Sequence, residues 1–168
     1  MDEAARADDW SAGASRPRMP ESYGIRDEAE GRGLLPWSHV AGRMQSAHNY
    51  WIATAGADGR PHVAPIWGLW QDAAFYFSTD PTSRKGRNLA ANPSVVIHLE
   101  SGDDAVILEG AAARFEDPRR MQDLDKAYFE KYGYHLIGNS VYRVRPLRAF
   151  AWFEADFPGS ATRWESLP

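Results

Sequence analysis

The chain has 168 residues, of which 43% are hydrophobic and 25% charged, a composition that predicts one globular domain with a full apolar core. It contains no cysteine, which excludes disulfides, thiolate metal sites and cysteine nucleophiles and favours an intracellular protein. The net charge of −4 argues against a broad nucleic-acid surface but permits local basic pockets.

The N-terminal region shows no recognisable motif. Residues 1–20 mix Ala, Asp, Arg, Ser, Gly and Pro without periodicity, so we expect a mobile arm ahead of a single domain over residues 21–168. The first residues lack the hydrophobic segment of a signal peptide, and no apolar run approaches the roughly 18 residues of a membrane span. We therefore expect a cytoplasmic protein.

The first regular element is a helix over residues 36–48, where Val40, Met44 and Ala47 share one face. Its two histidines, His39 and His48, are nine residues apart and fall on opposite faces, so we expect no shared metal site.

Strand-like segments follow. Residues 50–55 are apolar, the Asp58-Gly59 dipeptide predicts a hairpin, and residues 61–70 and 75–78 read as the next two strands of a meander.

The second half of the chain continues this pattern. Residues 95–100 and 105–115 flank a turn and predict a second hairpin. Asp117-Pro118 opens a helix that runs to Tyr132, and residues 141–144 and 147–153 predict two last strands. About six to seven strands and three short helices, without βαβ alternation, indicate an α+β domain built on an antiparallel barrel.

The segment YFSTDPTSRKGRNLAAN, residues 76–92, follows an aromatic strand with turn residues and then a short helix over residues 84–91. Arg84 and Lys85 fall in the first turn of that helix, where cations oppose the helix dipole unless an anion is bound. The hydroxyls of Thr79 and Ser83 could donate to the same anion, so the segment predicts a phosphate site. The alternative is a solvated helix start with ordinary surface cations.

Four stretches carry a family resemblance: YWIATAGADGRPHVAPIW, YFSTDPTSRKGRNLAANPSVVIHLE, AVILEGAAARF and ATRW. Over residues 50–164 the chain resembles the pyridoxamine 5′-phosphate oxidase-like, flavin-binding split-barrel superfamily. The resemblance implies an antiparallel split β-barrel and a homodimer with the cofactor in a groove between two subunits. It implies that the cofactor phosphate is bound by residues of the Ser-Arg-Lys segment, namely Ser78, Thr79, Ser83, Arg84, Lys85 and Asn88. It also implies that Arg163 and Trp164, joined by Trp152, lie near the cofactor, from the other subunit.

The departures from the family pattern bear on the reaction. Pyridoxamine-phosphate oxidases carry an Arg and a Lys where this chain has Ala64 and Leu69, so the resemblance does not imply vitamin B6 synthesis. The stretch DGRPHVAPIW is more similar to the actinobacterial branch, many members of which use the deazaflavin coenzyme F420 in place of FMN. That likeness implies a two-electron, hydride-transferring reduction of an activated C=C, C=N or nitro group in a small organic substrate. No catalytic side chain is required, because the cofactor carries the chemistry.

Other candidates remain open at this stage. His62 either faces the cofactor groove or is an exposed strand histidine. Pro65, Ile66 and Trp67 either present backbone groups and an aromatic wall to the ring or belong to an ordinary core strand. The chain could also be an FMN-dependent oxidase, or a non-catalytic protein that stores or senses flavin or haem, because each needs the same anion clamp.

Overall fold

A computed structural model describes Trp10 and residues 13–165, and these form nine strands and four α-helices, besides two short 3-10 helices. The strands are β1 (Ala14–Ser15), β2 (Tyr50–Ala55), β3 (Pro61–Ile66), β4 (Leu69–Gln71), β5 (Ala74–Ser78), β6 (Ser94–His98), β7 (Asp104–Arg114), β8 (Val141–Phe153) and β9 (Thr162–Glu165). The helices are α1 (Trp37–Ser46), α2 (Arg84–Ala91), α3 (Pro118–Tyr132) and α4 (Phe157–Ser160). None of the helices in the described part of the chain is long and apolar enough to cross a membrane.

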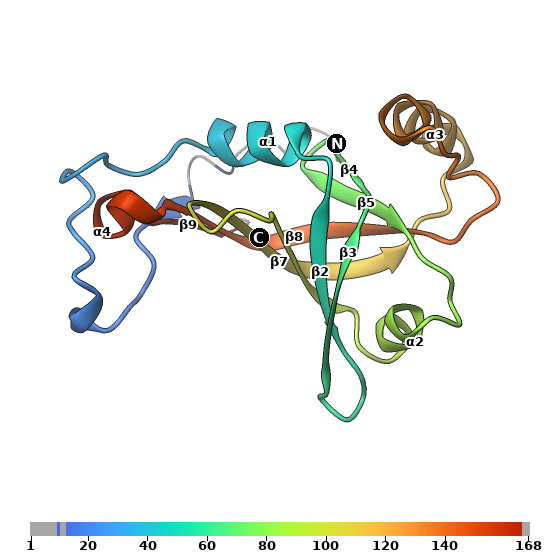
Figure 1. The fold of residues 1–168 in the computed structure, drawn as a ribbon, viewed down its shortest axis with the longest axis horizontal. Coiled ribbons are helices and arrows are strands. Elements are labelled where there is room, and N and C mark those ends of the chain that lie inside the picture. Colours follow the sequence, from blue (N-terminus) through green and yellow to red (C-terminus); the bar gives the residue numbers. More distant parts are fainter. Residues whose placement is uncertain (1–9, 11–12, 166–168) are drawn as a thin grey trace, which may run out of the picture.

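All strand pairings are antiparallel, and the main order is β1-β9-β8-β7-β6-β2-β3. The long strand β8 connects two parts of the sheet, since its first residues pair with β5 and its later residues with β9. Figure 1 shows β7 and β8 running along the long axis, with α2 below one half and α4 beside β9 near the other end. The prediction of an α+β antiparallel split barrel is confirmed.

Residues 61–70 were expected to form one strand of a meander, and this expectation is wrong. The strand breaks at Trp67-Gly68, so β3 pairs only with β2 whereas β4 pairs with β5. There is no room for a side chain at Gly68, because a Cβ would overlap the ring of Phe75. The chain therefore turns a corner at Gly68, where two strands with different partners meet.

The last two predicted strands are one continuous strand, β8. Pro146 lies within this strand, although proline cannot donate to a strand ladder. The structure accommodates it where the register between β7 and β8 shifts, at Glu109 and Gly110. Gly110 approaches the carbonyl of Arg145 too closely for any side chain, so the irregularity depends on glycine at this position.

The predicted helices are present with the expected end signals. Asp117 caps α3 by accepting hydrogen bonds from the backbone N–H groups of Arg119 (3.0 Å) and Arg120 (3.1 Å). Gly133 ends the helix in the left-handed conformation, with φ of 72°. The core divides into a large cluster between α1 and the sheet and a smaller one beneath α3.

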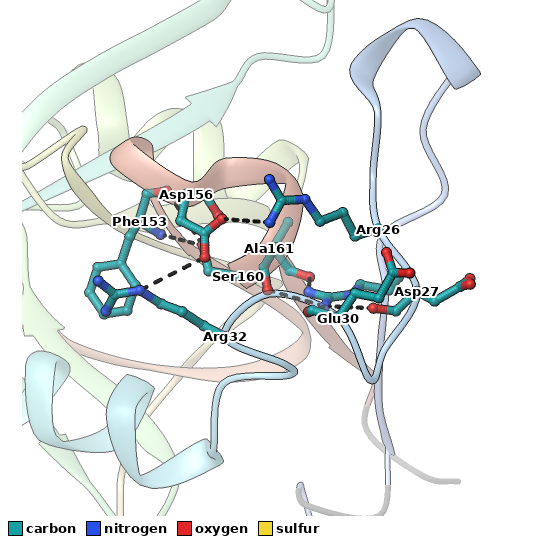
Figure 2. Close-up of polar contacts among 10 residues, drawn as sticks. Arg26, Asp27, Glu30, Arg32, Phe153, Asp156, Ser160 and Ala161 are labelled. Atoms are coloured by element: carbon teal, nitrogen blue, oxygen red, sulfur yellow. Dashed lines mark hydrogen bonds and ion pairs between the residues drawn. The ribbon is translucent and has the colours of Figure 1, made fainter.

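The segment before α1 differs from the expected mobile arm in its described residues. Trp10 stacks on Trp37 at 4.6 Å, and β1 pairs with β9. The Arg16 guanidinium donates to the carbonyl of Ala161 at 2.9 Å, and also to the carbonyl groups of Asp27, Glu30 and Gly159. Figure 2 shows Arg26 and Arg32 reaching the carboxylate of Asp156, at 3.7 and 3.8 Å. Residues 1–9 and 11–12 of the expected arm lie outside the described residues.

The turn between β4 and β5 provides a stability prediction. Asp72 and Ala73 both have positive φ, 47° and 52°, which is unfavourable for a residue with a Cβ. We expect Ala73→Gly to raise the free energy of unfolding by about 0.5–1 kcal/mol, measured by urea denaturation. Ala74→Gly, in the adjoining strand, is the matched control and should lower it. A destabilised Ala73→Gly variant would contradict the argument.

Candidate functional site

The first turn of α2 is organised by two hydroxyls. Ser83 caps the helix, since its Oγ accepts the backbone N–H of Gly86 at 3.0 Å. The same Oγ lies 3.1 Å from Oγ1 of Thr79. Each hydroxyl has one hydrogen and only one is used between the two oxygens, so the other remains free to donate to a ligand. By helix geometry the N–H groups of Arg84 and Lys85 have no acceptor within the helix.

The charge at this helix start is positive and uncompensated. Arg84 and Lys85 occupy the first turn, which contains no acidic residue. In the described part of the chain no carboxylate lies within ion-pair distance of either side chain, and Arg84 makes only a long contact of 3.4 Å to the carbonyl of Pro61. Burial lowers the pKa of Lys85 from its ordinary value. A partly buried, unpaired lysine of this kind is stabilised by a bound anion.

His62 on β3 faces the same two cations. In the register of β2 and β3 it lies opposite Thr54, on the side of the sheet that packs against α2. Its Nδ1 is buried and has no hydrogen-bond partner among the described residues. Burial and the charges of Arg84 and Lys85 lower the pKa of His62 from its ordinary value. Of the two readings of His62, the structure supports the one in which it faces the site.

These groups lie together and form a candidate anion site, which we call the α2 cation cluster: Thr79, Ser83, Arg84, Lys85 and His62. It offers a free hydroxyl hydrogen, two free backbone N–H groups, two cations and an unsatisfied imidazole nitrogen. This donor set matches a phosphate, and no part of it requires a metal. The residues present therefore fit the phosphate end of a flavin-type cofactor.

Two further residues predicted for the phosphate lie outside the cluster. Ser78 is half-buried in β5, where it pairs with Val141 of β8. Asn88 is only 8% exposed and donates to Oγ1 of Thr54 at 3.0 Å. The prediction that Asn88 binds the cofactor is thus not supported by its position, because its amide fastens α2 to β2.

Pro65, Ile66 and Trp67 do not form one wall. Pro65 is exposed on the outer sheet face, Ile66 is buried in the core, and Trp67 is 39% exposed at the corner after β3. Alternation along β3 explains the first two, because successive side chains point to opposite faces. Only Trp67 offers an open aromatic ring.

The C-terminal candidates lie far from the α2 cation cluster within one chain. Ser78 is opposite Val141, whereas Trp152 lies eleven residues farther along β8, which corresponds to about 35 Å. Figure 1 likewise shows β9 away from α2. Arg163 is half-buried in β9 and contacts Glu165. Trp164 was expected against the cofactor, but it is fully buried in the core, so its main role is packing.

Sequence reasoning also missed a group of residues around Trp67. Tyr132 and His48 contact this ring, and Lys131 lies over the ring of Tyr132. These residues come from the end of α3 and from the loop after α1. No local motif marks them. A run of aromatic residues with a lysine at the end of a helix was the only available signal.

The site makes a pH prediction. We expect the pKa of His62 in the cofactor-free protein to lie below the ordinary value of about 6.5, because nearby cations and burial disfavour its protonated form. Replacing Arg84 and Lys85 by alanine removes this repulsion and should raise the pKa. Histidine ring chemical shifts followed by NMR across pH 4–9 would measure both. A His62 pKa above 6.5 in the unmodified protein would contradict the described geometry.

Fold and site together define a class of protein: an antiparallel split barrel with a candidate phosphate site at the start of a short helix. The sequence model of the family described as pyridoxamine 5′-phosphate oxidase matches residues 38–157, more than half of the chain. The protein therefore belongs to the pyridoxamine 5′-phosphate oxidase-like family.

Solved structures share this fold. A conserved hypothetical protein from Mycobacterium tuberculosis, Rv2991, is 24% identical with a TM-score of 0.64, over 77% of this chain and 89% of that chain. An F420 reductase is 21% identical with a TM-score of 0.52, over 64% and 93%. HutZ, the heme storage protein from Vibrio cholerae, is 18% identical with a TM-score of 0.58, over 71% and 95%. The fold is thus shared by a reductase and by a heme storage protein.

Proposed function

We propose that the protein is an oxidoreductase that uses a flavin or the deazaflavin coenzyme F420 to reduce a small organic substrate by two electrons. The α2 cation cluster carries this proposal, because its unpaired cations and free donors suit the phosphate that both cofactors bear. The family assignment and the reductase of the same fold support it.

The residues of this chain would bind and orient the cofactor. Arg84 and Lys85 hold the phosphate, and the free hydroxyl of the Thr79–Ser83 pair donates to one of its oxygens. The sugar-alcohol chain separates the ring from the phosphate, and we propose that the ring extends along β3 toward the exposed indole of Trp67. When bound, such a cofactor supplies hydride-transfer chemistry.

F420 is the cofactor we favour over FMN. The stretch DGRPHVAPIW and the absence of the two strand cations at Ala64 and Leu69 are similar to the deazaflavin-using branch. Arg60 and Arg87 are exposed beside the cluster and could meet the longer acidic tail of F420. A second candidate function is non-catalytic storage or sensing of flavin or haem, favoured by the heme storage protein of the same fold.

The test is a titration of the purified protein with FMN and, separately, with F420, following the fluorescence of each cofactor. Tight binding of F420 alone would support a hydride-transferring reductase, and tight binding of FMN alone would direct the assignment to a flavoprotein. Turnover of the bound, reduced cofactor with an unsaturated or nitro compound separates an enzyme from a storage protein. Binding of neither cofactor would refute the proposal.

We also propose a homodimer that pairs the outer face of the sheet. Strand register places one row of side chains across six strands on this face: Pro65, Trp51, His98, Ile107, Phe150 and Arg163. A groove of about 420 Å³ with apolar lining opens beside them, and Val63 and Leu147 are more than half exposed. Such a face is large for an unpartnered surface. Pairing it would bring Arg163 and Trp152 of one subunit toward the cofactor of the other.

The dimer gives a direct prediction. We expect sedimentation equilibrium at micromolar concentration to show a dimer, and Ile107→Glu to dissociate it by placing a charge in the centre of the row. Phe129→Glu, on the exposed side of α3, is the control and should remain dimeric. A monomeric unmodified protein would contradict this proposal.

A further inference from the structure

An aromatic cluster is exposed at the corner between β3 and β4. We call it the Trp67 corner: Trp67, Tyr132, Tyr134 and His48. Trp67 stacks on Tyr132 at 4.9 Å with 12° between the ring planes, and Tyr134 and His48 flank it at 5.4 and 6.3 Å. Tyr134 is 63% exposed, so these rings border solvent. The corner comprises open aromatic surface from three separate parts of the chain.

The backbone beneath these rings is clamped in place. The carbonyl of Gly68 accepts from Nζ of Lys131 at 3.2 Å and from the hydroxyl of Tyr132 at 2.9 Å. The same hydroxyl accepts from the N–H of Gly68 at 3.1 Å, and the carbonyl of His48, at 2.8 Å, is a second acceptor for its single hydrogen. Gly68 follows Trp67 directly, so the indole is held by a hydrogen-bond network that lies below it. Exposed rings held this firmly resemble a binding platform, because little order is lost when a ligand stacks on them.

A cation lies at the inner end of the stack. Nζ of Lys131 is 5.1 Å from the ring centre of Tyr132 and 4.9 Å from that of Tyr50, whose hydroxyl it also contacts at 2.9 Å. Burial lowers the pKa of Lys131 to about 8, so the side chain of Lys131 is still mostly protonated at pH 7. Lys131 thus places a positive charge against Tyr132, the ring on which Trp67 stacks, and this charge favours an anionic flat ligand at the corner.

The position of the corner links it to the α2 cation cluster. Arg84 contacts the carbonyl of Pro61 at the first residue of β3, and Trp67 follows its last residue. The two sites thus lie at opposite ends of the same strand, about 20 Å apart along it. A cofactor whose phosphate is bound at one end and whose ring extends along β3 would bring that ring toward the corner.

We propose that the Trp67 corner is the substrate platform, and that it stacks a flat, conjugated compound bearing a carbonyl or carboxylate group. Its assignment to substrate rests on the proposed function. The stacking itself does not, because it depends only on the rings and on Lys131. The proposed substrates are therefore planar aromatic or quinone-like molecules, and flexible aliphatic molecules are not expected to bind there.

The experiment uses the cofactor-free protein and 2-naphthoate as the probe, with affinity measured by ligand-observed NMR titration. We expect Tyr134→Ala and Trp67→Leu each to weaken binding at least about fivefold, since each removes a stacking surface. Phe129→Ala is the matched control: Phe129 is an exposed α3 ring, 48% exposed and stacked on His135, outside the corner, and should change affinity less than about twofold. Decahydro-2-naphthoate, which is not flat, should bind at least about fivefold more weakly than the flat probe.

Either of two results overturns the platform: unchanged probe affinity in Tyr134→Ala, or equal affinity for the flat and saturated probes. Tyr134 is largely exposed, so its variant should fold, and a thermal melt by circular dichroism verifies this. A shift from dimer to monomer in Tyr134→Ala, with probe binding intact, would instead identify the corner as a subunit interface and also overturn it. Retained probe selectivity with no binding of FMN or F420 refutes the proposed oxidoreductase and leaves the platform standing.

Discussion

Replacing both Arg84 and Lys85 by alanine is expected to weaken cofactor binding at least tenfold. Each side chain can make a charge-assisted hydrogen bond to phosphate, and such bonds contribute about 1.5–3 kcal/mol. Arg84 is exposed, so solvent screens part of its contribution, and tenfold is the lower bound. Fluorescence titration with FMN and F420 measures the change. The substitutions should not affect folding, because no ion pair or close hydrogen bond of either side chain is lost in the described structure.

The matched control keeps the net charge equal. Arg119 and Lys126 are both exposed on α3, away from α2, so Arg119→Ala with Lys126→Ala removes the same two charges. We expect this double variant to bind the cofactor within about twofold of the unmodified protein, since long-range charge is screened. Equal losses in the two double variants would show a general charge effect, and no loss in the Arg84 and Lys85 variant would remove the site.

Trp164→Ala is expected to cost about 3–5 kcal/mol of unfolding free energy, which is the usual range for truncating a large buried aromatic residue. Trp164 is fully buried, and its ring packs edge-on against Trp37 at 5.7 Å. Because a domain of this size is stable by only about 5–15 kcal/mol, the midpoint of thermal unfolding should fall by roughly 10 °C. Urea denaturation, with the unfolding slope compared between variants, measures the effect.

Two variants sharpen this test. Nε1 of Trp164 is buried without a hydrogen-bond partner in the described structure, so Trp164→Phe removes an unsatisfied donor and should cost about half as much as alanine or less. Phe129→Ala, at an exposed ring, should cost under about 1 kcal/mol. If Trp164→Ala kept its stability and lost only cofactor affinity, the residue would be a binding residue and its core assignment would be wrong.

Features that depend on neighbouring residues could be predicted from the sequence. The start and end of α3 follow from Asp117-Pro118 and Gly133, and the hairpin of β2 and β3 follows from Asp58-Gly59. The phosphate segment was predictable for the same reason: Thr79, Ser83, Arg84 and Lys85 lie within seven consecutive residues, and a single turn and helix start bring them together.

Features that depend on contacts between residues far apart in the chain could not be predicted from the sequence. Residues 61–70 look like one strand, but packing of Gly68 against Phe75 and the pairing of β4 with β5 break it in two. No strand was predicted beyond residue 153, yet pairing with β8 and β1 makes β9 a strand and buries Trp164. Whether His62 faced the site was open as well, because alternation specifies two faces without saying which one α2 covers.

By itself, then, the sequence determined α1, α2 and α3, the antiparallel β class and a candidate phosphate clamp built from contiguous residues, since local backbone preferences and short-range hydrogen bonds specify all three. Only the tertiary structure decided that His62 joins this clamp, that Asn88 and Trp164 serve the core, and that Lys131 and Tyr132 hold Trp67 at the other end of β3. Those outcomes depend on which segments pack together, and contacts between residues far apart in the chain determine that packing.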